Sequence, residues 1–213
     1  MPSAPKKVIV RAFGGVENLE SEPLASLSPG PGEVIVDLAS VGSGVPPFTP
    51  GIEGGGIISA VGAGVEDRTV GQRVILTLGA PAGKGTYCSQ FLALATETLP
   101  VPAGVPDDLI GALWLPFLTA WGALVWRKQV QPGQVVMLPA ASSSVAIAAS
   151  QIAKQRGAIT IGTTTSPEKI GELQALDAAQ YDHRVLTKDT EQPWWRSVKR
   201  LTGGKGVDVI FDP

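Results

Sequence analysis

The chain has 213 residues, with 17 Lys+Arg against 19 Asp+Glu, so its formal net charge is −2. This near balance argues against nucleic acid or an anionic membrane as the main partner, because either favours a basic excess. The hydrophobic fraction of 44% excludes general disorder. A single cysteine, Cys88, and a single histidine, His183, exclude an internal disulfide and a Cys/His zinc site.

The first half of the chain alternates between short strand-like segments and turns rich in glycine and proline. This spacing predicts a small β-barrel or sandwich over residues 1–105. The expected strands lie within residues 7–13, 28–42, 54–65, 71–78 and 86–94.

After Pro106 the pattern changes to alternating helices and strands. Asp107 or Asp108 can cap the next helix, which Pro116 is expected to bend. Alternation of this kind predicts a parallel α/β sheet with right-handed crossovers over residues 106–213. The expected strands are 135–140, 158–163 and 207–213, and the expected helices are 142–157 and 167–176.

The sequence contains no evident leader peptide or membrane span. The N-terminal segment MPSAPKKVIV lacks the apolar stretch of a signal peptide. The longest apolar run, 109–126, is interrupted by Gly and Pro, which is typical of a buried helix rather than of a span of about 20 residues. We therefore expect a cytoplasmic protein with no membrane or nucleic-acid partner.

The junction between the strand at 135–140 and the next helix has features of a dinucleotide site. A helix that begins directly after a strand offers free N–H groups and partial positive charge to a phosphate. The usual fingerprint is G-x-G-x-x-G/A, whereas residues 141–146 read Ala-Ser-Ser-Ser-Val-Ala. Ser143 stands where the backbone approaches phosphate, and Ala146 is small enough for close packing on the strand. An ordinary helix start capped by serine explains the same residues, so that alternative stays open.

The second strand of this half ends in Thr163-Thr164-Thr165-Ser166, with no Asp or Glu at its tip. A carboxylate there would hold the ribose 2′-hydroxyl of NAD. Hydroxyl groups with Lys169 and Arg184 nearby favour NADP(H) over NAD(H). The alternative for Lys169 is a solvated lysine on a helix surface.

Residues 79–86, GAPAGKGT, look like a phosphate-binding P-loop but depart from its pattern G-x-x-x-x-G-K-[ST]. Only three residues separate Gly79 from Gly83, and Gly85 stands where Ser or Thr binds Mg²⁺. A glycine-rich hairpin in the β half is the preferred interpretation.

Longer motifs connect the chain to a known family. They are PGPGEVIVDLASVG, PFTPGIEGGGIISAVGAGV, VGQRV and GTYCSQFLAL in the first half, LPFLTAWGALV between the halves, and QPGQVVMLPAASSSVAIAASQIAKQRGAITIGTT with LTGGKGVDVIFDP in the second. With these motifs the chain resembles the medium-chain dehydrogenase/reductase superfamily, especially its zinc-independent quinone-oxidoreductase-like (zeta-crystallin-like) branch. The resemblance implies an N-terminal GroES-like β domain followed by a Rossmann cofactor domain.

The resemblance implies hydride transfer from NAD(P)H, with NADPH preferred, to a quinone, enone or related carbonyl compound. Zinc-dependent relatives carry G-H-E where this chain reads Gly51-Ile52-Glu53, and Ile52 cannot ligate a metal. We expect no zinc, and no side chain is assigned as the catalytic group. The expected cofactor contacts are Thr119, Ser142, Ser143, Ser144, Val145, Ala146, Thr163, Thr164, Lys169 and Arg184.

Two departures from the family pattern limit this expectation. The loop after residues 41–44 is shorter than in most members, and the chain stops at Asp212-Pro213, at the fourth strand of a fold whose six strands have the order 3-2-1-4-5-6. We therefore expect a fragment, a deletion product or an incompletely represented chain, with a homodimer for a full-length parent. A non-catalytic cofactor-binding or scaffold member of the same fold is the alternative function.

Overall fold

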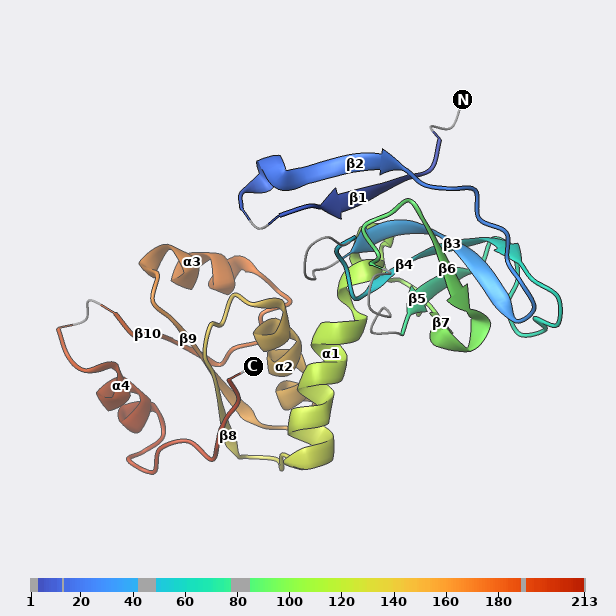
Figure 1. The fold of residues 1–213 in the computed structure, drawn as a ribbon. Helices are drawn as coiled ribbons and strands as arrows, with labels where there is room; N and C mark the ends of the chain where they lie inside the picture. Colours follow the sequence, from blue (N-terminus) through green and yellow to red (C-terminus); the bar gives the residue numbers. More distant parts are fainter. Residues whose placement is uncertain (1–3, 13, 42–48, 78–84, 189–190, 213) are drawn as a thin grey trace. The chain divides into compact units, whose positions relative to one another are not determined.

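The computed structural model describes residues 4–12, 14–41, 49–77, 85–188 and 191–212. These residues form two compact units, residues 1–114 and 115–213, which are coloured blue to green and green to red in Figure 1. The P-loop-like segment 79–86 and the short loop after residue 41 lie largely outside the described residues.

The N-terminal unit is built from antiparallel strands, as expected for a GroES-like domain. Its larger sheet has the order β6-β3-β4-β5-β7. A separate hairpin of β1 with β2 pairs with the segment before β6 through an isolated antiparallel β-bridge between the backbones of Lys7 and Cys88. The strands are β1 (Lys6–Val10), β2 (Leu19–Pro23), β3 (Glu33–Val41), β4 (Gly54–Val61), β5 (Arg73–Leu76), β6 (Gln90–Leu94) and β7 (Thr98–Pro100).

Alternating apolar residues on these strands enclose the core of this unit. The fully buried side chains include Val34, Val36, Ile58 and Val74. Three short 3₁₀ helices connect or follow the strands: η1 (Val16–Asn18), η2 (Ala95–Glu97) and η3 (Asp107–Ala112).

The helix expected to bend at Pro116 is divided instead. Helix η3 ends at Ala112, α1 (Trp114–Trp121) begins two residues before the proline, and π-helical turns (η4, Gly122–Arg127) continue it. The proline therefore lies in the first turn of α1. Backbone N–H groups in the first turn of an α-helix have no intrahelical acceptor. The N–H that proline lacks therefore costs no helical hydrogen bond at this position.

The C-terminal unit is a parallel sheet in the order β10-β9-β8-β11. Numbered within this unit, the strands run 3-2-1-4, which is the order expected for the first four strands of a Rossmann fold. The elements are β8 (Val135–Leu138), α2 (Ser144–Gln155), β9 (Ile159–Thr164), α3 (Pro167–Ala175), β10 (His183–Leu186), α4 (Trp194–Leu201) and β11 (Val209–Ile210).

Strand β8 is buried on both faces, which explains its uncharged sequence. Val136 and Leu138 belong to a core shared with α1 and α2, whereas Met137 packs with Val198 of α4 on the other side. Figure 1 shows α2 and α4 beside this sheet. The α/β fold class with a Rossmann-like second unit is thereby confirmed.

One glycine of β9 depends on close packing. A Cβ atom at Gly162 would lie 2.8 Å from the ring of Tyr181, whereas a Cβ at Gly171, on the exposed side of α3, would meet nothing within 4 Å. We predict that Gly162→Ala lowers the free energy of unfolding by about 1–3 kcal/mol through overpacking. Gly171→Ala should raise it by about 0.5–1 kcal/mol, because alanine favours the helix.

Urea unfolding followed by circular dichroism measures both variants. Equal shifts of the two midpoints in one direction would contradict this account of the packing.

Candidate cofactor site at the carboxyl edge of the sheet

Alanine and serine occupy the turn from β8 into α2, where the usual dinucleotide fingerprint has glycine. Ala140 adopts φ 47°, a left-handed conformation that is uncommon for a residue with a side chain. The turn is closed by a bond from the Ser143 N–H to the Ala140 carbonyl at 2.8 Å. A second bond, from the Ala141 N–H to the Thr163 carbonyl at 2.9 Å, attaches it to the end of β9.

Ser143 is the N-cap of α2. Its hydroxyl accepts a hydrogen bond from the Ala146 N–H at 3.2 Å, so the helix-capping alternative describes part of its role. Ala146 is fully buried in the core beneath the turn, where a larger side chain would separate the helix from the strand.

Backbone donors remain available at this helix start. Within the described part of the chain, no acceptor is found for the N–H groups of Ser142, Ser144 and Val145. The side chains of Ser142 and Ser144 are exposed. Such amides, at the positive end of a 12-residue helix, suit a phosphate group.

The end of β9 lies at the same sheet edge. The side chains of Thr163 and Thr164 are buried, and Thr164 accepts a bond from the Ser166 N–H at 3.2 Å. The side chains of these two threonines are therefore packed within the sheet edge and are not exposed to solvent. Ser166, the N-cap of α3, and Lys169, which is exposed in its first turn, are more accessible.

Glu168 was not among the residues expected here. Its carboxylate accepts a hydrogen bond from the Ser166 hydroxyl at 2.5 Å, which lowers the pKa of Glu168 below its usual value. The sequence signal was the Ser-Pro-Glu start of α3, because Ser is a common N-cap, Pro is common at the first helical position and acidic residues favour the first turn. A negative charge thus lies close to the strand tip where none was expected.

The side chains of two other expected residues are bonded to backbone carbonyls. Arg184 pairs with Gly162 in the sheet, and its guanidinium donates to the carbonyls of Leu173, Ala179 and Tyr181. It therefore ties α3 to β10. The Thr119 hydroxyl donates to the Leu115 carbonyl of its own helix at 2.7 Å.

Two hollows lie elsewhere. One of about 540 Å³ is at the amino ends of β8 to β10, lined by His183, Lys205 and Asp208 among others. Open α/β sheets bind ligands at their carboxyl ends, so the edge at α2 is the better candidate for a cofactor.

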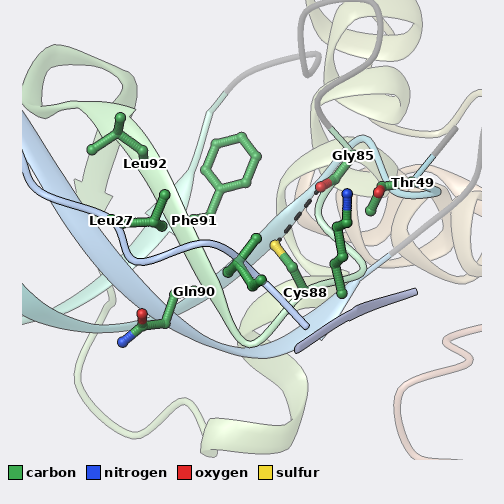
Figure 2. Close-up of a pocket in the computed structure, with 9 residues that line it drawn as sticks. Leu27, Thr49, Gly85, Cys88, Gln90, Phe91 and Leu92 are labelled. Carbon is green, nitrogen blue, oxygen red and sulfur yellow. Dashed lines mark hydrogen bonds between the residues drawn. The ribbon is translucent and has the colours of Figure 1, made fainter. Parts of the chain in front are cut away.

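The second hollow, of about 200 Å³, lies in the N-terminal unit and is lined mainly by apolar residues. Figure 2 shows Cys88 in its wall, with the thiol donating to the Gly85 carbonyl at 3.8 Å. Burial raises the pKa of the Cys88 thiol to about 11. The thiol stays protonated near neutral pH, so it is not a nucleophile.

Comparison with known proteins agrees with this architecture. The family model described as "Alcohol dehydrogenase GroES-like domain" matches residues 30–112. A 2-haloacrylate reductase from Burkholderia sp. is 30% identical over 96% of the chain, which spans 65% of that protein's length.

Solved structures agree as well. A crystal structure of an NAD-dependent alcohol dehydrogenase is 32% identical with a TM-score of 0.83, covering 96% of this chain and 69% of that one. The Escherichia coli quinone oxidoreductase complexed with NADPH is 25% identical with a TM-score of 0.78, covering 97% and 65%. The chain belongs to the medium-chain dehydrogenase/reductase superfamily.

Among the described residues, no three His, Cys, Asp or Glu side chains gather where they would hold a metal ion. Within the same ranges, no helix is both long and apolar enough to cross a membrane.

Asp182, immediately before β10, connects that segment to α2 and β9. Its carboxylate contacts the Lys154 ammonium at 2.6 Å and accepts from the Thr160 N–H at 2.8 Å. Burial raises the pKa of Asp182, but the bonds from Lys154 and Thr160 outweigh that effect, so the pKa lies below its ordinary value of 3.8.

We predict that Asp182→Asn lowers the free energy of unfolding by about 1 kcal/mol at neutral pH. Because the folded-state pKa is depressed, this contribution is complete well above pH 3.8 and is lost as the pH falls through the folded value. Urea unfolding at a series of pH values should show the gap to the parent narrowing in acid. Asp177→Asn, at an exposed position, is the control. A gap independent of pH would contradict the assignment.

Proposed function

We propose that this chain provides the GroES-like and cofactor-binding portions of an NADPH-dependent reductase for conjugated carbonyl compounds, quinones or enones. The observation that carries the proposal is the set of available amides at Ser142, Ser144 and Val145, beside the tip of β9. The chain's similarity to reductases supports the reaction class. The 2-haloacrylate reductase supports this substrate type, and the NADPH-complexed quinone oxidoreductase supports the substrate and cofactor types.

The chain's own residues bind and orient the cofactor in this proposal. The three amides and the Ser143 N-cap hold the pyrophosphate, with Val145 and Ala146 forming the first turn beneath it. Ser166 and Lys169 face the adenosine ribose, which Thr163 and Thr164 support from below. The bound nicotinamide supplies the hydride. Thr119 remains the proposed contact for the nicotinamide ribose.

We propose that the reaction needs no zinc. Ile52 occupies the place of the metal-binding histidine of zinc-dependent relatives, and a hydrocarbon side chain offers no lone pair to a metal. Action in the cytoplasm and dimerisation of a longer parent remain predictions.

Turnover is tested by following NADPH oxidation with benzoquinone, naphthoquinone, cyclohexenone and a haloacrylate. Steady oxidation with any of them is the expected result. Cofactor binding without turnover across the panel would favour the non-catalytic alternative. Absence of binding would reject the cofactor site itself.

A charge change at the helix start tests where the pyrophosphate lies. We predict that Ser144→Asp raises the Kd for NADPH about tenfold or more, because its carboxylate would stand beside the pyrophosphate. The same carboxylate favours the helix N-terminus, so the free energy of unfolding should stay equal or rise by about 0.5 kcal/mol. Fluorescence titration of NADPH measures binding.

Ser144→Asn is the matched neutral control. If the Asp and Asn variants bound NADPH equally well, the pyrophosphate would lie elsewhere.

Lys169 and Glu168, two residues of opposite charge in the first turn of α3, allow a test of the preference for NADPH over NADH. Lys169→Gln should raise the Kd for NADPH about threefold and leave that for NADH unchanged, since only NADPH has a 2′-phosphate. Glu168→Gln should lower the Kd for NADPH by a similar factor. Tighter binding of NADH than NADPH by the parent would overturn the NADPH assignment and leave the cofactor site in place.

A further inference from the structure

Tyr181 lies directly beneath the proposed pyrophosphate turn. Tyr181 is 6% exposed, and its ring packs over Gly162, where a Cβ atom would lie 2.8 Å from the ring. The Arg184 guanidinium stands 5.8 Å from the ring centroid. The ring therefore has little freedom to move.

The backbone on either side of Tyr181 is also fixed. The Gln180 N–H donates to the Ser150 hydroxyl of α2 at 3.1 Å. The Thr160 hydroxyl of β9 donates to the Gln180 carbonyl at 2.7 Å and accepts from the Asp182 N–H at 3.0 Å. The residues flanking Tyr181 are thus attached to two separate elements of the unit.

The tyrosine hydroxyl reaches back to the turn. It donates to the Ala141 carbonyl at 2.8 Å, and Ala141 is fully buried. Burial raises the pKa of the Tyr181 hydroxyl well above its ordinary value, so its proton stays in place for this bond.

The Ala141 carbonyl and the Ser142 N–H belong to one planar peptide group. In a trans peptide these two bonds point in opposite directions. A hydrogen bond that fixes the carbonyl toward Tyr181 therefore directs the Ser142 N–H away from it. The same bond polarises the peptide, which strengthens its N–H as a donor.

We propose that Tyr181 is a positioning residue that locks the Ala141–Ser142 peptide so that the Ser142 N–H faces the pyrophosphate. This inference rests on the proposed function, because it requires a phosphate at that amide. The turn lacks the glycines of the usual fingerprint, and Ala140 adopts φ 47° at its start. In this proposal the bond from Tyr181 holds the following peptide in one orientation.

Tyr181→Phe removes the hydroxyl and retains the ring. We expect the Kd for NADPH to rise about tenfold, equivalent to about 1.4 kcal/mol. The Kd for adenosine 2′-monophosphate, which has no pyrophosphate, should stay unchanged. Because both ligands bind only folded protein, the ratio of the two constants does not depend on the folded fraction. Tyr87→Phe, which removes a hydroxyl from the N-terminal unit, should leave the ratio unaltered.

The outcomes separate the two proposals. If the parent binds neither NADPH nor adenosine 2′-monophosphate, the proposed function fails and the positioning role fails with it. If the parent binds both and Tyr181→Phe leaves the ratio unchanged, only the positioning role is overturned. An equal rise in both constants also overturns it, since that result describes a residue needed for stability alone.

Discussion

The turn that carries the chain out of β8 must reverse direction within a few residues and leave amides open at the start of α2. Glycine normally meets this constraint, because it adopts left-handed conformations without steric cost. Here Ala140 does so with φ 47°, at a cost on the order of 1 kcal/mol. The strained turn persists because its neighbours fix it: β9 through Thr163, α2 through the Ser143 cap, and the segment before β10 through Tyr181.

This arrangement connects stability with cofactor binding. The bonds that hold the turn come from elements that follow it in the sequence, so the conformation of the turn depends on β9 and on the segment before β10 as well as on its own residues. The proposed site is preorganised: its three amides have no acceptor among the described residues, so the proposed function requires little further ordering on binding. Serine side chains in place of glycine add hydroxyl groups to this edge without closing it, because those of Ser142 and Ser144 are exposed.

Local patterns in the sequence predicted the architecture well. The uncharged strand expected at 135–140 and the helix that follows it agree with the hydrophobic periodicity. The strand order agrees with the Rossmann fold that the resemblance implied, but the periodicity did not predict β10 (His183–Leu186). The divided helix around Pro116 was missed, because a proline can begin a helix as readily as bend one.

The site was predictable only where it is local in sequence. Residues 142–146 were proposed as a phosphate-binding turn from their own motif, whereas the Tyr181 hydroxyl bonds to a residue 40 positions away. Arg184 was expected near the ribose from its charge, but buried carbonyls engage it. Glu168 was overlooked because only the folded cap shows that its carboxylate turns back to Ser166. The bond between Ser166 and Glu168 is local, whereas the tertiary contacts of Tyr181 and Arg184 have no signature in a single sequence.

In the proposed site, a turn without glycine presents its amides to a pyrophosphate. Titrating isotope-labelled protein with NADPH and following its amide resonances tests this most directly. The account predicts that the largest shifts fall on Ser142, Ser144 and Val145, followed by the first turn of α3. Shifts concentrated at the opposite end of the sheet, around His183 and Lys205, or no shifts near α2, would contradict it.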